Sequence, residues 1–230
     1  MLFHLKPHKV MISDANEELI NLYLVIRDNI EELISSLKHH KNTAEYYYKI
    51  RQLDRSEKYN RLSNVQKASR FLYLNKTCFN GLYRVNKNGQ FNTPYGKYKS
   101  LYFNEAALYD IRNYLNNKNI NICSYDFEIM LNNLKNNDTF VYLDPPYFPI
   151  SDTADFNSYT KEKFCKEDHI RLKECCDRLT DCNIKFMLSN SDSKFIRDLY
   201  KEYEILTITA PRNIRSSSQR HINEVVIKNY

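Results

Sequence analysis

The chain has 230 residues, of which 42% are hydrophobic, and it carries a formal net charge of +6. This length suits one large domain or one domain with an insertion, and the apolar share excludes a disordered chain. No run approaches the ~18 apolar residues of a membrane span, and the opening apolar stretch is too short for a signal peptide, so we expect a cytoplasmic protein.

The six cysteines show no Cys-x-x-Cys spacing, and in a cytosolic protein we expect them to be reduced thiols. Cys165, His169 and Cys176 fall on one expected helix, but a structural zinc ion requires four converging ligands. We therefore expect no metal site.

The positive charge is concentrated in one part of the chain. Residues 58–104 contain nine lysines and arginines and ten aromatic residues but no aspartate or glutamate. The rest of the chain carries more acidic than basic residues. An acid-free window of this length favours a nucleic-acid surface over the plainer alternative, a solvated lysine-rich face.

The first expected elements are a short strand at residues 9–13 and a helix that runs to about residue 37. The helix is indicated by apolar residues at a spacing of about 3.6, and Ser13 or Asp14 is suited to cap it. Residues 43–77 are expected to be helical in two or three pieces.

Residues 80–100 differ in composition, because all three glycines of the chain fall there. Asn88 and Gly89 lie between two short polar stretches, a pattern that predicts a hairpin turn. A helix is expected to follow at residues 104–116.

The second half alternates between strand and helix. Strands are expected at residues 119–123, 139–143, 184–189, 204–209 and 222–228, helices at 127–135, 166–180 and 192–201, and loops at 148–164 and 211–221. This alternation predicts an open α/β sheet with crossover helices. Only a loop joins the last two strands, so they should be antiparallel and form a reversed edge of the sheet.

Polar side chains follow several expected strands, where ligands bind in open α/β sheets. They are Asp14, the pair Tyr125 and Asp126, Asp144, and the pair Ser189 and Asn190. An acid after an early strand of such a sheet typically binds ribose hydroxyls, so Asp14 suggests a nucleoside-bearing cofactor. The plainer alternative, that Asp14 only caps a helix, is the more common one.

The four residues Asp144-Pro-Pro-Tyr147 are more specific. Asp144 supplies carboxylate oxygens and Pro145 a carbonyl oxygen, while the two prolines remove competing N–H donors and stiffen the turn. Tyr147 adds a flat face on which a base can stack. Two acceptors without a donor suit the exocyclic amine of a nucleobase and can aim its nitrogen lone pair at an electrophile.

These residues resemble a known family, because Asp144 to Tyr147 match the D-P-P-Y motif of amino-methyltransferases that modify adenine in DNA. Residues 77–99 (T-C-F-N-G-L-Y-R-V-N-K-N-G-Q-F-N-T-P-Y-G-K-Y-K) resemble the target-recognition hairpin of Dam-type, D12 class DNA adenine methyltransferases. Three further segments resemble the same family in its order: I-S-D-A-N-E-E-L-I-N-L-Y (12–23), F-M-L-S-N-S-D (186–192) and R-N-I-R-S-S-S-Q-R-H-I-N-E-V-V-I (212–227). Five ordered matches are a strong signal.

The resemblance implies a class I methyltransferase-like open sheet, mostly parallel with a reversed C-terminal strand, and an inserted, mainly helical DNA-recognition subdomain. Residues 1–42 and 105–230 would form the catalytic domain, and residues 43–104, with a hairpin at 80–96, the recognition subdomain. The implied function is site-specific transfer of a methyl group from S-adenosylmethionine to adenine in a short duplex site, often GATC. A restriction–modification role is also typical of the family.

The resemblance also implies roles for individual residues. Asp14, Tyr125, Asp126, Phe127 and Asp144 would bind the cofactor. Asp144, Pro145, Pro146 and Tyr147 would form the catalytic corner for the flipped base.

The implied DNA-binding residues are Asn80, Leu82, Arg84, Asn86, Pro94, Lys97 and Lys99. Arg84 is expected to read a guanine, with a phosphate contact as the alternative.

One segment of the family pattern is missing. The family carries a lysine–glycine motif and then a central strand that ends in Phe-x-Gly-x-Gly, whereas Gly81 is the first glycine here. Loss of that strand would leave two unpaired strand edges and half of the cofactor pocket open. Two hypotheses follow: an active methyltransferase whose missing segment comes from an upstream reading or a second chain, or an inactive remnant that only binds DNA. A third, methylation of RNA or of a protein amine, fits the D-P-P-Y motif and the hairpin less well.

Overall fold

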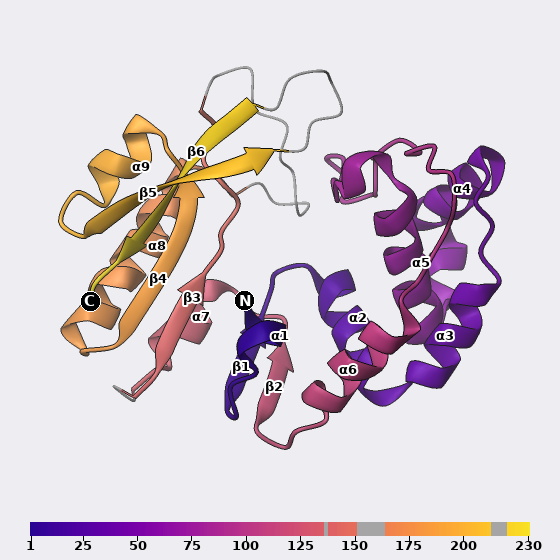
Figure 1. Cartoon of the computed structure of the whole chain (residues 1–230), viewed down its shortest axis with the longest axis horizontal. Helices are drawn as coiled ribbons and strands as arrows, with labels where there is room; N and C mark the ends of the chain where they lie inside the picture. The colour runs from indigo at the N-terminus through magenta and orange to yellow at the C-terminus, as the bar shows by residue number, and fades with distance from the viewer. Residues whose placement is uncertain (136–137, 151–163, 213–219) are drawn as a thin grey trace. The chain divides into compact units, whose positions relative to one another are not determined.

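The computed structural model describes residues 1–135, 138–150, 164–212 and 220–230 (Figure 1). They pack as two compact units, Met1–Asp126 and a second that contains the described residues from Phe127 onward. Each unit is described by itself. None of the helices in these ranges is long and apolar enough to cross a membrane.

The first unit contains a two-stranded parallel sheet. β1 (Val10–Ser13) pairs with β2 (Ile120–Cys123), in a register that places Val10 beside Ile120 and Ser13 beside Cys123. Both expected strands are thus confirmed, and the carboxyl ends of the two strands meet at the same edge. A short helix, α1 (Leu2–Leu5), precedes them.

The next segment forms two helices, α2 (Glu17–Asp28) and α3 (Ile30–Lys38), where the sequence predicted one. Asn29 separates them with a non-helical backbone (φ −137°, ψ 42°). The apolar spacing continues across this break, because Ile26 and Ile30 are both buried, so the pattern alone does not reveal it. The expected caps were also wrong: Asn16 caps α2, and its Oδ1 accepts hydrogen bonds from the backbone of Glu18 and Leu19.

Residues 43–77 form four helical pieces, one more than the upper expectation. They are α4 (Ala44–Arg51), the 3₁₀ turns η1 (Gln52–Arg55) and η2 (Glu57–Arg61), and α5 (Asn64–Thr77). Ser63 and Gln66 start α5 with a reciprocal capping box. α5 packs against α2 and α3, and α6 (Glu105–Leu115) packs on the same pair, so one apolar core joins the four helices.

The expected hairpin is present, but its ladder is short. A 3₁₀ turn, η3 (Phe79–Gly81), leads into it, and antiparallel bridges join Cys78 to Tyr95 and Val85 to Phe91. The N–H of Gly89 donates to the carbonyl of Asn86 at 2.9 Å and closes the turn. Gly89 has φ 76°, a conformation that glycine adopts without steric cost.

The second unit is a four-stranded sheet with helices. Its strands are β3 (Phe140–Leu143), β4 (Lys185–Ser191), β5 (Glu204–Arg212) and β6 (Arg220–Lys228), in the order β3-β4-β6-β5, and its helices are α7 (Phe127–Asn132), α8 (Lys166–Asp181) and α9 (Lys194–Leu199). β3 and β4 are parallel, and α8 connects them. The mixed α/β class is therefore confirmed.

The last two strands are antiparallel and together form the reversed edge of the sheet, as expected. β6 lies between β4 and β5 and is antiparallel to both, an order for which the sequence made no prediction. β5 and β6 also extend further than predicted, because their ladder continues to the pair Arg212 and Arg220. Most of the expected loop at 148–164 lies outside the described residues.

The sheet of this unit is held by an apolar core. Phe186, Leu188, Val225 and Ile227 on β4 and β6 have no exposed surface. Leu172 and Leu179 on α8 and Ile196 on α9 pack against them.

Candidate active site and nucleic-acid interface

In the first unit, the residues after β1 and β2 lie together. Ser13 Oγ donates a hydrogen bond to the carbonyl of Tyr125 at 3.2 Å, and Ser124 Oγ donates to the carbonyl of Asp14 at 3.1 Å. These bonds join the two strand ends, as the rule for parallel sheets predicts. Asp14 and Tyr125 are therefore neighbours at one edge.

The Asp14 carboxylate is held in place by the start of α2. Its Oδ1 accepts the N–H of Asn16 at 2.7 Å, and the side chain is half-buried. A carboxylate has about four acceptor positions, and its oxygens are the kind of acceptor that ribose hydroxyls use. The donor and acceptor chemistry of this edge thus fits a nucleoside.

The next three expected cofactor residues are consecutive in the chain but differ in exposure and packing. Tyr125 is 57% exposed, which leaves its ring accessible for stacking, and Asp126 is half-buried. Phe127 begins the second unit, where its ring packs on Phe164 and beneath the guanidinium of Arg171. In this structure Phe127 is packed against its own unit.

In the second unit, Asp144 follows β3 and is held by the neighbouring strand. Ser189 Oγ on β4 donates to Asp144 Oδ1 at 2.9 Å and lies 3.2 Å from the hydroxyl of Tyr142. Asp144 is exposed, so its other oxygen is accessible to a ligand. No described residue donates a hydrogen bond to the carbonyl of Pro145. Both groups therefore remain candidate acceptors for a donor from outside the chain.

The residues after the two prolines are tied to β4 and β6. Phe148 N–H donates to Asn190 Oδ1 at 2.9 Å, and Ser191 Oγ donates to the Phe148 carbonyl at 2.6 Å. The hydroxyl of Tyr147 donates to Glu224 at 3.4 Å. Burial raises the pKa of Tyr147, while its hydrogen bond with Ser189 opposes that shift, so the ring stays neutral and suited to stacking on a base.

Five of the seven expected DNA-binding residues are exposed in the region of the hairpin. They are Asn80, Leu82, Pro94, Lys97 and Lys99. Asn80 has φ 55°, a left-handed conformation that asparagine tolerates. An exposed Leu82, at 47%, is available for apolar contact.

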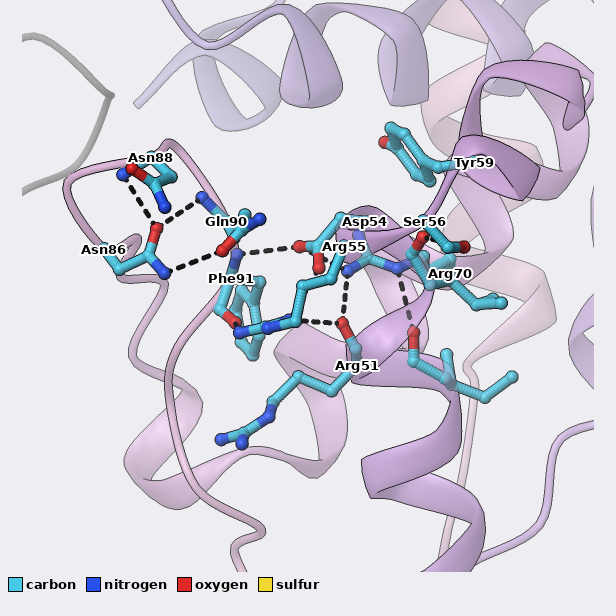
Figure 2. Close-up of polar contacts among 12 residues, drawn as sticks. Arg51, Asp54, Arg55, Ser56, Tyr59, Arg70, Asn86, Asn88, Gln90 and Phe91 are labelled. Carbon is cyan, nitrogen blue, oxygen red and sulfur yellow. Dashed lines mark hydrogen bonds and ion pairs between the residues drawn. The ribbon is translucent and has the colours of Figure 1, made fainter.

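Arg84 and Asn86 are both half-buried, but their side chains differ in the hydrogen bonds that they make. Arg84 makes one long hydrogen bond, from Nη2 to Asn92 at 3.5 Å, and its buried Nε has no partner among the described residues. The Asn86 side chain is engaged inside the turn, where it bonds Gln90 and the N–H of Asn88. Arg84 thus keeps donors for a ligand. Asn86 instead shapes the turn, where Figure 2 shows its bonds to Gln90 and Asn88.

The basic window needs one correction. Arg70 belongs to the window, but only 2% of its side chain is exposed, and it pairs with Glu18 and Asp54. Its charge is neutralised inside the unit, so it contributes no surface for a nucleic acid. A local run of charges does not reveal carboxylates that come from other parts of the chain.

Sequence reasoning missed several supporting residues. Ser124, which holds the backbone at Asp14, carried no signal. Ser189 was noted only as a polar strand end, which was the signal that could have placed it beside Asp144. Asp54 lies outside every motif, and Glu18 falls within the family-like segment 12–23 but was given no role there.

Comparison with known proteins gives a consistent result. The model of the family described as D12 class N6 adenine-specific DNA methyltransferase matches residues 1–214. A protein named Type II methyltransferase M1.LlaDCHI, from Lactococcus lactis subsp. cremoris, is 43% identical over 100% of this chain and 82% of its own length. Type II methyltransferase M.MjaIII, from Methanocaldococcus jannaschii, is 39% identical over 96% of this chain and 80% of its own length. DNA adenine methylase from Escherichia coli K12 is 31% identical over 95% of this chain and 78% of its own length.

The match spans most of the residues and includes both strand-end groups and the hairpin. With its mixed α/β fold and the acceptor corner after β3, the chain belongs to the D12 class of N6 adenine-specific DNA methyltransferases.

Proposed function

We propose that the chain transfers a methyl group from S-adenosylmethionine to the N6 amine of an adenine flipped out of a short, GATC-like duplex site. The observation that carries this proposal is the corner at Asp144, where Ser189 fixes one carboxylate oxygen at 2.9 Å. The two prolines contribute no N–H donor there. An adenine amine would donate one hydrogen to Asp144 and one to the carbonyl of Pro145.

This corner would act by orientation. Two acceptors hold both amine hydrogens, so the nitrogen lone pair points away from the protein toward the methyl donor. Tyr147 would stack on the flipped base, which contributes about 1–3 kcal/mol. Asp144 is also suited to accept the proton that the amine loses once the methyl group is attached.

The cofactor would be held by the edge formed after β1 and β2. Asp14 would accept the ribose hydroxyls, and Tyr125 and Asp126 would contact the adenine of the cofactor. Asp144 and Phe127 are further proposed cofactor contacts. When bound, S-adenosylmethionine supplies an electrophilic methyl group on a positively charged sulfur.

We assign residues 43–104 to target recognition and the remainder to catalysis. The guanidinium of Arg84, which makes one long hydrogen bond among the described residues, is the proposed guanine reader. Asn80, Leu82 and Pro94 would reach neighbouring bases, and Lys97 and Lys99 would contact phosphates. Asn86 would assist by shaping the turn.

The test measures methyl transfer from labelled S-adenosylmethionine to a GATC duplex, to a duplex with adenine replaced, to RNA and to a glutamine peptide. We expect N6-methyladenine in the first duplex only. Asp144→Ala should lower the rate by about a hundredfold or more while DNA affinity stays unchanged. Asp198→Ala, an exposed acid on α9, is the matched control and should keep full activity.

Two outcomes would contradict the proposal. DNA binding without transfer would indicate an inactive binding protein. Transfer to RNA or to the peptide in preference to the duplex would assign a different substrate class.

A further inference from the structure

A buried arginine lies at the centre of the helical region of the first unit. Arg70 Nη2 lies 2.7 Å from Asp54 Oδ2, and its Nη1 lies 3.3 Å from Glu18 Oε1. The same guanidinium donates to the backbone carbonyls of Ile50 and Arg51, each at 3.0 Å. Arg70 therefore has partners on three sides, which is the condition for a charge to be stable in the interior.

One of the two carboxylates continues into the recognition hairpin. Asp54 Oδ2 accepts the backbone N–H of Phe91 at 2.8 Å, and the neighbouring Arg55 donates to the carbonyl of Phe91 at 2.8 Å. Both contacts fix the returning strand of the hairpin through its backbone, as Figure 2 shows. The Asp54 side chain is only 10% exposed, so water does not replace these bonds easily.

The other carboxylate contacts the outgoing strand. Glu18 Oε2 accepts the hydroxyl of Tyr83 at 2.9 Å, and Oε1 accepts the hydroxyl of Tyr59. Glu18 is itself fixed, because its backbone N–H is capped by Asn16 at the start of α2. Both strands of the hairpin are thus joined to the same buried arginine through one carboxylate each.

Tyr83 is well suited to hold the outgoing strand of the hairpin in place. Its ring packs on Phe71 at 5.0 Å and on Phe91 at 5.4 Å between centroids. Burial raises its pKa, and the charge of Glu18 raises it further, so the hydroxyl remains a neutral donor. Arg84, the next residue in the chain, is the proposed guanine reader.

We propose that Glu18 and Asp54 are positioning residues for target recognition. Through Tyr83 and Phe91 they hold the two strands of the hairpin so that the guanidinium of Arg84 is presented in one orientation. Bidentate base reading is sensitive to orientation, whereas phosphate contacts tolerate movement. This inference rests on the proposed function, because it assumes that Arg84 reads a base.

The test uses the complete chain and selection from a pool of randomised DNA duplexes. Tyr83→Phe removes one hydroxyl and keeps the packed ring. We expect Tyr83→Phe to lower the base preference by about tenfold at one position of the DNA site. This should be the same position at which Arg84→Ala abolishes the preference. The salt dependence of binding, which counts phosphate contacts, should stay unchanged.

Tyr109→Phe is the matched control. The hydroxyl of Tyr109 also donates to a helix glutamate, Glu31, at 2.8 Å, but this pair does not involve the hairpin. The variant should keep the base preference of the wild-type chain. Glu18→Gln, which keeps an acceptor but removes the charge, should retain part of the preference, whereas Asp54→Ala should lose it.

Hydrogen exchange gives a second readout that does not depend on DNA. The amide of Phe91 should exchange at least about tenfold faster in Asp54→Ala, while amides of β4 in the second unit keep their protection. Unchanged exchange at Phe91 would overturn the positioning role of Asp54.

The outcomes separate the two levels of inference. If Arg84→Ala changes the base preference and Tyr83→Phe does not, the positioning role is wrong and the proposed reader stands. If Arg84→Ala itself leaves the preference unchanged, the proposed reader is wrong, and the positioning role is overturned with it.

Discussion

The sheet of the second unit and the helical region that carries the hairpin both have an apolar core, but the helical region also buries a charged arginine with its carboxylate partners. The sheet buries Phe186, Leu188 and Val225, which have no exposed surface. The helical region buries Arg70, together with the hydroxyls of tyrosines that donate to backbone carbonyls and carboxylates. Apolar burial has no directional requirement, whereas hydrogen bonds and ion pairs require defined angles.

Accurate orientation of side chains is therefore expected to matter more in the helical region than in the sheet. A core of leucine and valine tolerates small shifts between its elements, so it suits a platform that only needs to be stable. A buried ion network with several partners is stable in one arrangement, so it suits a loop that must present a side chain accurately. Three predictions test this difference.

The largest effect is expected for Arg70→Met. The change keeps much of the volume but leaves Asp54 and Glu18 without their shared cation, which costs about 3–5 kcal/mol of unfolding free energy. Urea denaturation measures the loss. Arg27→Met is the control, because Arg27 pairs with Asp28 at the surface and should cost less than about 1 kcal/mol. Equal effects of the two would show that the buried network contributes no more than a surface pair.

Leu188→Ala comes next, with an expected cost of about 3 kcal/mol from lost burial and the cavity left behind. Leu188 lies on β4 with no exposed surface. The base preference of the remaining folded protein should be unchanged, since the described residues that make up this core do not include any of the hairpin. A shift in base preference as large as that of Tyr83→Phe would show that the sheet core also determines base preference, and the contrast between the two regions would be wrong.

The smallest effect concerns pH and involves one histidine in each unit. Burial lowers the pKa of His169, which is packed among Phe148, Phe164 and Phe195, to about 4, and burial lowers the pKa of His40 to about 4 as well. Below about pH 6.5 the unfolded chain therefore binds more protons than the folded chain. Stability should fall by about 2 kcal/mol per histidine as pH drops from about 6.5 to about 4.

Two variants sharpen this prediction. His169→Phe should make the decline shallower and cost little at pH 7, because its ring has mainly aromatic neighbours. His40→Phe should make the decline shallower too but cost stability at pH 7, because His40 bonds the hydroxyls of Tyr46 and Ser69. Denaturation across this pH range measures both, and an unaltered slope in both variants would contradict the assignment.

Much of the fold was predictable from the sequence, because it depends on local patterns. Short apolar runs indicated the strands, and Asp14 and Asp144 were identified as the residues that follow two of them. The position of β6 inside the sheet carried no local signal, because strand order depends on packing between distant segments. The helix break at Asn29 was not predicted either, because the apolar spacing continues across it and so indicates one helix.

The candidate site was predictable to the extent that its residues are adjacent in the chain. Asp144 to Tyr147 and the hairpin were found as motifs. The support from Ser189, Glu18 and Asp54 was not, because each acts on a residue more than 30 positions away. Arg70 was misjudged for the same reason: its charge is visible in the sequence, and its partners are not.

The hairpin is attached to its support largely through main-chain atoms. Asp54 and Arg55 bond the N–H and carbonyl of Phe91, and Tyr47 bonds the carbonyl of Thr93 at 2.8 Å. Every residue type provides a carbonyl at these positions, and all except proline provide an N–H. Side chains that take no part in these bonds, such as those of Leu82 and Arg84, can therefore be exchanged without altering these anchors. If the hairpin reads DNA as proposed, this design would allow the recognised sequence to change during evolution, or to be re-engineered, while the attachment of the hairpin stays the same.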